Sequence, residues 1–141
     1  MPAGAKRLVT VDTSVAVPLL LRNHEAHSTV TRWRGGKRIS LCGHAWIETY
    51  AVLTRLPGTA RVTPVDAARV MASNFSAPIK PEPATLAAAV DLLAGAGVSG
   101  GAAYDGWIAL TAIDNQALLS SRDARAELTY RRLGAEVEMI S

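Results

Sequence analysis

The sequence predicts an α/β fold built on a mainly parallel central sheet of four to five short strands flanked by helices. Short apolar segments of strand length alternate with longer helical patterns along the chain. The first such segment, Leu8-Val9-Thr10-Val11, ends in a carboxylate, Asp12. Open α/β sheets bind ligands outside the carboxyl ends of their strands, so this acid is a candidate functional residue as well as a helix cap.

Turn and capping residues place the elements of the first half of the chain. After the strand at residues 8–11, a helix is expected at 14–22, capped by Thr13 or Ser14, with Pro18 in its early turns. Glycines and prolines then separate the following elements. These are a helix at 24–34, a strand at 39–42, a helix at 45–56 and a helix at 64–75, which Thr63 caps.

The second half repeats the alternation. A proline-rich connector at residues 77–83 has room for one very short strand. A helix rich in Ala and Leu follows and is broken by the glycine-rich stretch GAGVSGG. The expected helices are at residues 84–94, 103–115 and 123–133, and the expected strands are at 117–121 and 136–140.

Composition excludes several classes of protein. The chain has 141 residues, 49% of them hydrophobic and 19% charged, as in one ordinary globular domain, which we expect over residues 1–141. The basic start at Lys6 and Arg7 imitates a secretory signal, but Asp12 interrupts the apolar stretch. The single Cys42 excludes an intrachain disulfide, and no apolar run is long enough for a membrane span. We therefore expect a cytoplasmic protein that does not contact membranes.

Two acids lie where a helix should be apolar. In the helix at 45–56, the neighbours of Glu48 at three and four residues are mostly apolar. The corresponding neighbours of Asp105 are Gly, Ala and Ile, whereas Asp114 points to the opposite side of the same helix. Burying an unpaired carboxylate is costly, and neither stripe carries a compensating Lys or Arg.

A divalent cation would resolve this cost. Asp123 follows a second apolar strand, so it is expected beside Asp12 at the carboxyl edge of the sheet. Oxygen ligands from Asp12, Glu48, Asp105 and Asp123 suit Mg²⁺ or Mn²⁺, whereas the one Cys and three His lack zinc-type spacing. The alternative for Asp12 and Asp123 is an N-cap, since each precedes a helix.

Four segments together resemble the PIN domain, and more narrowly the VapC-type ribonuclease toxins of type II toxin–antitoxin pairs. They are VDTSV with Asp12, AWIETYAVLTRL with Glu48, GVSGGAAYDGWIALTA with Asp105, and LLSSRDARAELTYRRLGAEVEMI with Asp123. The segments occur in the family's order. The resemblance implies a three-layer PIN-like nuclease domain.

The resemblance also implies an activity and partners. It implies an endoribonuclease that uses Mg²⁺, with Mn²⁺ as an alternative, and leaves 5′-phosphate and 3′-hydroxyl ends. By position, Asp12, Glu48 and Asp105 match the three most regular acids, Asp123 matches the more variable fourth, and Ser121 stands where relatives often have Thr. It further implies an RNA substrate, an inhibitory VapB-type antitoxin, a homodimer and a toxin–antitoxin hetero-oligomer.

Further residues are candidates for supporting roles. Thr13 and Ser14 are placed to orient Asp12, and the basic residues around Asp123 are placed to contact RNA. The candidates for RNA contact are Arg122 and Arg125, followed by Arg131, Arg132, Lys37 and Arg38.

Two other functions stay open from the residues alone. A non-catalytic RNA- or protein-binding module would carry the same apolar pattern. An aspartyl-type phosphatase or phosphotransferase also places an Asp after its first strand, but it usually carries a second acid two residues later, where this chain has Ser14. A glycine-rich nucleotide-binding turn is missing after the strand.

Overall fold

The structure is a computed structural model that describes residues 7–141, so Lys6 and the rest of the first six residues of the expected domain lie outside the described part. Five strands and seven α-helices alternate in the described range. The strands are β1 (Val9–Val11), β2 (Ser40–Cys42), β3 (Ser76–Ile79), β4 (Leu118–Ser121) and β5 (Val137–Met139). The helices are α1 (Thr13–Leu20), α2 (His27–Arg34), α3 (Gly43–Thr54), α4 (Pro64–Asn74), α5 (Pro83–Gly95), α6 (Ala102–Asp114) and α7 (Ala124–Arg132), with a 3₁₀ turn, η1 (Gly58–Ala60).

All strand pairings are parallel, as the alternation of strands and helices predicted. One sheet has the order β1-β4-β5, and β2 pairs with β3 in a second. A single parallel bridge between Val9 and Ile39 joins them, which gives the order β3-β2-β1-β4-β5. The connector at 77–83 does contribute a strand, β3, although this strand begins one residue earlier, at Ser76.

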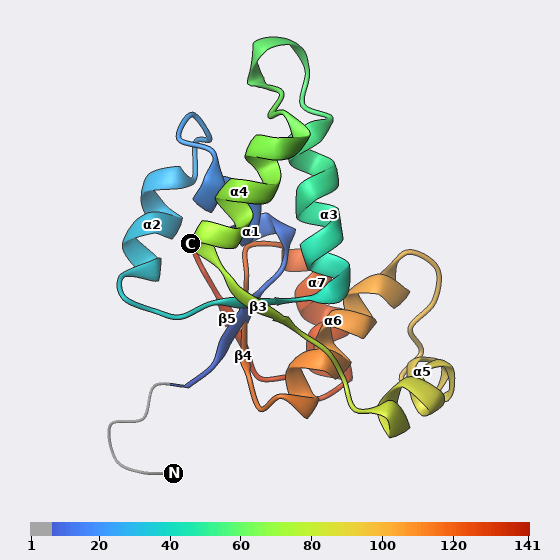
Figure 1. Ribbon diagram of the computed structural model, residues 1–141. Helices are drawn as coiled ribbons and strands as arrows, with labels where there is room; N and C mark the ends of the chain where they lie inside the picture. Colours follow the sequence, from blue (N-terminus) through green and yellow to red (C-terminus); the bar gives the residue numbers. More distant parts are fainter. Residues whose placement is uncertain (1–6) are drawn as a thin grey trace.

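The helices form two groups on the two sides of this sheet. Helix α1 packs on α2, α3 and α4, whereas α6 packs on α5 and α7. Figure 1 shows α1 to α4 gathered above the strands and α5 and α6 lying beside them at the right. Right-handed crossovers require this division, because the chain moves along the sheet in opposite directions from β1 and from β4. The predicted three-layer α/β arrangement is confirmed.

This topology creates a switch point between β1 and β4. The two strands are neighbours, but the connection after β1 leads toward β2 and the connection after β4 leads toward β5. Their register pairs Val11 with Ser120. The residues that follow, Asp12 and Ser121, therefore lie opposite each other at the carboxyl edge, where doubly wound sheets bind their ligands.

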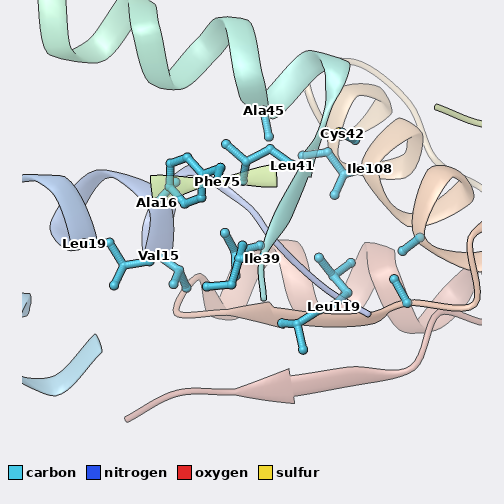
Figure 2. Packing of buried hydrophobic residues seen from close by; sticks show 14 of the residues in the cluster. Val15, Ala16, Leu19, Ile39, Leu41, Cys42, Ala45, Phe75, Ile108 and Leu119 are labelled. Carbon is cyan, nitrogen blue, oxygen red and sulfur yellow. The ribbon is translucent and has the colours of Figure 1, made fainter. Parts of the chain in front are cut away.

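Aliphatic side chains form most of the core, in keeping with an aromatic content of only 5%. Val11 of β1, Leu119 of β4 and Ile39, which directly precedes β2, are fully buried. Figure 2 shows Leu41 and Phe75 below Ala45 of α3, on the face of the sheet that this helix covers. Burying such side chains supplies most of the stabilisation of the fold.

Glycine allows a close helix contact directly after Asp105. A side chain added at Gly106 would meet the tip of Leu93 from α5 at 2.3 Å and that of Leu133, which follows α7, at 3.2 Å. The first turn of α6 therefore packs tightly between its neighbours, and this packing fixes where Asp105 lies.

No helix within the described residues is long and apolar enough to span a bilayer.

Candidate active site at the carboxyl edge of the sheet

Asp12 is the most buried acid of the predicted set, with 4% of its surface exposed. Its Oδ1 accepts a hydrogen bond from the backbone N–H of Ser14 at 3.1 Å and a short one from the Ser14 hydroxyl. Its Oδ2 accepts from the hydroxyls of Ser121 and Tyr130, each at 2.6 Å. Four donors therefore hold this carboxylate in one orientation, which offsets much of the cost of burying it.

The hydrogen bond from Ser14 makes Asp12 the N-cap of α1. The expectation that Thr13 or Ser14 caps this helix was wrong, because the extended backbone at Asp12 turns its carboxylate onto the first free N–H groups. The second oxygen of Asp12 lies outside the cap and takes the bonds from Ser121 and Tyr130. Capping and a site role are therefore compatible in this residue.

Two serines connect the ends of β1 and β4. Besides donating to Asp12, the Ser121 hydroxyl accepts the N–H of Asp123 at 3.0 Å. The Ser14 hydroxyl accepts the N–H of Arg122 at 2.8 Å. The predicted supporting role thus has a geometric basis for Ser14 and Ser121. Thr13 lines an adjacent hollow, and its side chain makes no hydrogen bond with the residues described.

Tyr130 is a site residue that the sequence did not reveal, since an aromatic residue on a helix is typical of an ordinary core position. The residue is fully buried, and its hydroxyl reaches Asp12 from α7. Burial and the neighbouring Asp12 carboxylate raise the pKa of the Tyr130 hydroxyl, so it remains a donor. A buried Tyr usually needs such a partner, but the sequence does not show which one.

Asp105 is half-buried in the first turn of α6, on the inward side that helical periodicity predicted. Burial, and then the charges of Asp12, Asp123 and Glu48, raise its carboxyl pKa from the ordinary 3.8 to about 6. Among the described residues, no hydrogen bond or ion pair engages this carboxylate. Three other acids thus act on Asp105, and no Lys or Arg pairs with it.

Glu48 lies on α3 at the edge of this group, with 41% of its side chain exposed. Its Oε2 lies 3.1 Å from Nε2 of His44, one turn earlier on the same helix. The histidine ring in turn stacks on Tyr104, with centroids 4.9 Å apart and planes at 12°. His44 therefore orients Glu48.

Asp123 is exposed and caps α7. Its Oδ1 accepts the N–H groups of Arg125 at 2.9 Å and Ala126 at 3.3 Å. The cap interpretation of Asp123 is therefore confirmed. Oδ2 makes no hydrogen bond with the described residues, so it is free to face the other acids.

The set of donors at this edge suits a hard divalent cation. Within residues 7–141, no three Asp, Glu, His or Cys side chains are close enough to enclose a metal ion as they stand. Mg²⁺ usually keeps several waters and takes only one or two protein carboxylates, so it does not require such an enclosure. The uncompensated charge around Asp105 is the observation that fits a cation here, with Asp12, Glu48, Asp105 and Asp123 as candidate ligands.

An open hollow of about 610 Å³ adjoins Asp123. Thr13, Ser14 and the exposed Arg122 and Arg125 form part of its lining. The weaker basic candidates do not gather here. Arg131 pairs with Glu127 at 2.8 Å, and residues 37–38 precede β2, at the opposite edge of the sheet.

Comparison with known proteins agrees with this arrangement. A family model described as the PIN domain matches residues 9–132, which include all four acids. The chain belongs to the PIN-domain family. Among PIN-domain relatives, ribonuclease VapC27 of Mycobacterium tuberculosis (strain ATCC 25618 / H37Rv) is 46% identical over 129 residues, which cover 92% of this chain and 94% of the relative. Ribonuclease VapC40 of M. tuberculosis (strain CDC 1551 / Oshkosh) is 38% identical over 138 residues, which cover 95% and 100%.

Solved structures share the PIN fold at low sequence identity. The structure of VapBC2 from Rickettsia felis bound to a DNA fragment from their promoter aligns with a TM-score of 0.68 and 13% identity, covering 95% of this chain and 99% of that one. At this identity the likeness concerns the fold, and it confirms the predicted fold family.

Proposed function

We propose that this PIN domain, over residues 1–141, is a Mg²⁺- or Mn²⁺-dependent endoribonuclease toxin of the VapC type. The observation that carries the proposal is the setting of Asp105: burial and then the charges of three other acids raise its pKa to about 6, His44 only partly offsets them, and no Lys or Arg pairs with it. The 46% identity to ribonuclease VapC27 supports the same reaction. A bound divalent cation would neutralise these acids, activate a water for in-line attack on a phosphodiester and stabilise the leaving oxygen.

The chain's own residues prepare this reaction. Ser14, Ser121 and Tyr130 fix both oxygens of Asp12, so this ligand needs no reorganisation when a cation binds. His44 contacts Oε2 of Glu48 and orients its carboxylate. Asp105 makes no hydrogen bond or ion pair with the described residues, and it would bind a cation in its ionised form, so protons would compete with the cation below about pH 6.

RNA is proposed to approach through the hollow beside Asp123. An acidic site repels a polyanion, so basic side chains must bring the substrate in. Arg122 and Arg125 line this hollow and are exposed. We expect them to hold phosphates on one side of the scissile bond, which leaves the acids to act on the bond itself.

Partners are proposed from the same likeness. We expect a cognate VapB-type antitoxin that inhibits the toxin, within a hetero-oligomer built on a toxin homodimer. The fold likeness to VapBC2 supports the antitoxin partner. Two apolar helix segments, at residues 15–21 and 46–56, are candidates for such contacts. The first is mostly core. In the second, Ile47 is 65% exposed beside an apolar hollow of about 280 Å³, which makes it the better candidate.

The test is cleavage of a labelled single-stranded RNA in Mg²⁺ by the wild type, by Asp105→Asn and by Asp114→Asn. Asp114 is a matched control, because it lies on the other side of α6, where its Oδ2 accepts the N–H of Glu82 at 2.7 Å. We expect cleavage by the wild type and Asp114→Asn, leaving 5′-phosphate ends, and loss in Asp105→Asn or EDTA. RNA binding without cleavage would favour the binding module, and phosphate release from a phosphomonoester would favour the aspartyl-type enzyme.

A further inference from the structure

Tyr104 is an exposed aromatic residue at the edge of the acidic group. It has 61% of its surface exposed, and it is the only aromatic among the large exposed apolar side chains of residues 7–141. It directly precedes Asp105 in the first turn of α6. A single exposed apolar residue is common on protein surfaces, so what distinguishes Tyr104 is its place beside the proposed catalytic acids.

The ring of Tyr104 is held from one side. His44 stacks on it almost in parallel, with ring centroids 4.9 Å apart and an angle of 12° between planes. His44 is fixed in its turn by Glu48, at 3.1 Å. A contact between α3 and α6 thus sets the direction of the Tyr104 ring before any ligand arrives.

The second face of the ring remains open. With one face against His44, an exposure of 61% requires that the other face and the edge be in solvent. A flat, preoriented aromatic face is a stacking surface for a nucleobase, and such stacking contributes about 1–3 kcal/mol per base with little sequence preference. The base must be unpaired to reach it.

We propose that the open face of Tyr104, backed by His44, is a nucleobase subsite for a nucleotide next to the scissile phosphate. This inference rests on the proposed ribonuclease function and narrows its substrate to RNA that is single-stranded or looped at that nucleotide. The His44–Tyr104 pair then has two roles at once. It orients Glu48 on one side and positions the substrate on the other.

The first measurement is RNA binding in EDTA, where no cleavage occurs, by fluorescence anisotropy with a labelled single-stranded oligonucleotide. Tyr104→Phe keeps the ring and is expected to bind within about twofold of the wild type. Tyr104→Leu is expected to weaken binding about tenfold, which corresponds to the lower part of the stacking range. Val90→Ala on α5, where Val90 is 77% exposed, controls for the removal of exposed apolar surface.

The second measurement replaces single nucleotides of the RNA by abasic ones. At one position near the cleavage site, the abasic change should lower kcat/KM of the wild type about tenfold and that of Tyr104→Leu by less than twofold, because the variant has no ring on which that base could stack. Equal effects of the abasic change in the two proteins, or unchanged RNA binding by Tyr104→Leu, would contradict the proposed nucleobase subsite. Neither result would contradict the proposed ribonuclease function. A wild type that cleaves no RNA would overturn both proposals.

Discussion

The hydroxyl of Tyr130 lies 2.6 Å from Oδ2 of Asp12, a residue 118 positions earlier in the chain. This bond joins α7 to the end of β1 across the switch point of the sheet. Ser121, at the end of β4, donates to the same oxygen. The three elements that meet at the carboxyl edge are therefore held together through one carboxylate.

Tyr130→Phe tests how much the Tyr130–Asp12 hydrogen bond stabilises the fold. The ring stays in place and only the hydroxyl is removed, so we expect the free energy of unfolding to fall by about 2 kcal/mol, as for other hydrogen bonds to charged groups. Urea unfolding measures the change. Tyr50→Phe is the control, since the half-buried Tyr50 makes no hydrogen bond through its hydroxyl with the described residues, and it should cost less than about 0.5 kcal/mol. Equal decreases in the two variants would contradict a special role for the Tyr130–Asp12 bond.

Asp105 predicts an unusual dependence of stability on pH. Its folded pKa of about 6 lies above the ordinary 3.8, so the folded state takes up the proton first. Between pH 7 and pH 4, protonation of this group therefore stabilises the metal-free protein as the pH falls. At pH 7 the Asp105 carboxylate is mostly ionised, and its charge destabilises the folded state. Asp105→Asn has no such charge, so its free energy of unfolding at pH 7 should exceed that of the wild type by about 1 kcal/mol, a value already reduced for solvent screening.

Urea unfolding in EDTA at pH 7 and pH 5 measures both effects. The difference in unfolding free energy between Asp105→Asn and the wild type should shrink as the pH falls, while Asp114→Asn shows no such change. A difference that stayed constant between the two pH values would show that the neighbouring acids do not act on Asp105 as described.

Two substitutions at Asp123 separate capping from cation binding. Asp123→Ser keeps an N-cap oxygen for α7, so its stability should stay within about 0.5 kcal/mol of the wild type, whereas Asp123→Ala should be less stable by about 1 kcal/mol. Both variants lack the carboxylate, and both should cleave RNA more slowly, by about tenfold or more. Full activity in Asp123→Ser would show that Asp123 serves only as the N-cap of α7 and takes no part in cation binding.

Arg122 and Arg125 predict a salt effect on RNA binding. Replacing both by Gln should weaken binding and lower the slope of log Kd against log salt concentration by about 0.7 for each phosphate of a single strand that the arginines no longer neutralise. Arg69→Gln is the control, because this exposed residue of α4 pairs with Asp66 at 3.6 Å. An unchanged slope in the double variant would exclude both arginines from the RNA path.

Much of the fold was predictable from local patterns. The alternation of apolar strands and helices gave every α-helix and strand of the described range to within a few residues, and Thr63 caps α4 through its hydroxyl, as predicted. Periodicity correctly placed Asp105 inward, because that argument uses only neighbours on one helix. The strand order follows from pairings between distant segments, and local patterns do not encode it.

The site was predictable only in its acids. An Asp after a strand signals both a cap and a ligand, and the structure gives Asp12 the cap that the sequence assigned to its neighbours. Tyr130 escaped prediction because nothing within its own helix indicates where its hydroxyl points. The stacking of His44 on Tyr104 joins two helices that are far apart in the sequence, so it too needed the structure.

Direct metal binding is the measurement that tests the central claim most closely. Calorimetric titration with Mn²⁺ should show binding to the wild type, none detectable to Asp105→Asn, and wild-type binding to Asp114→Asn. It should also weaken as the pH falls below about 6, where protons compete for Asp105. A wild type that binds no Mn²⁺, or an Asp105→Asn variant that binds it equally well, would contradict a cation site formed by these acids.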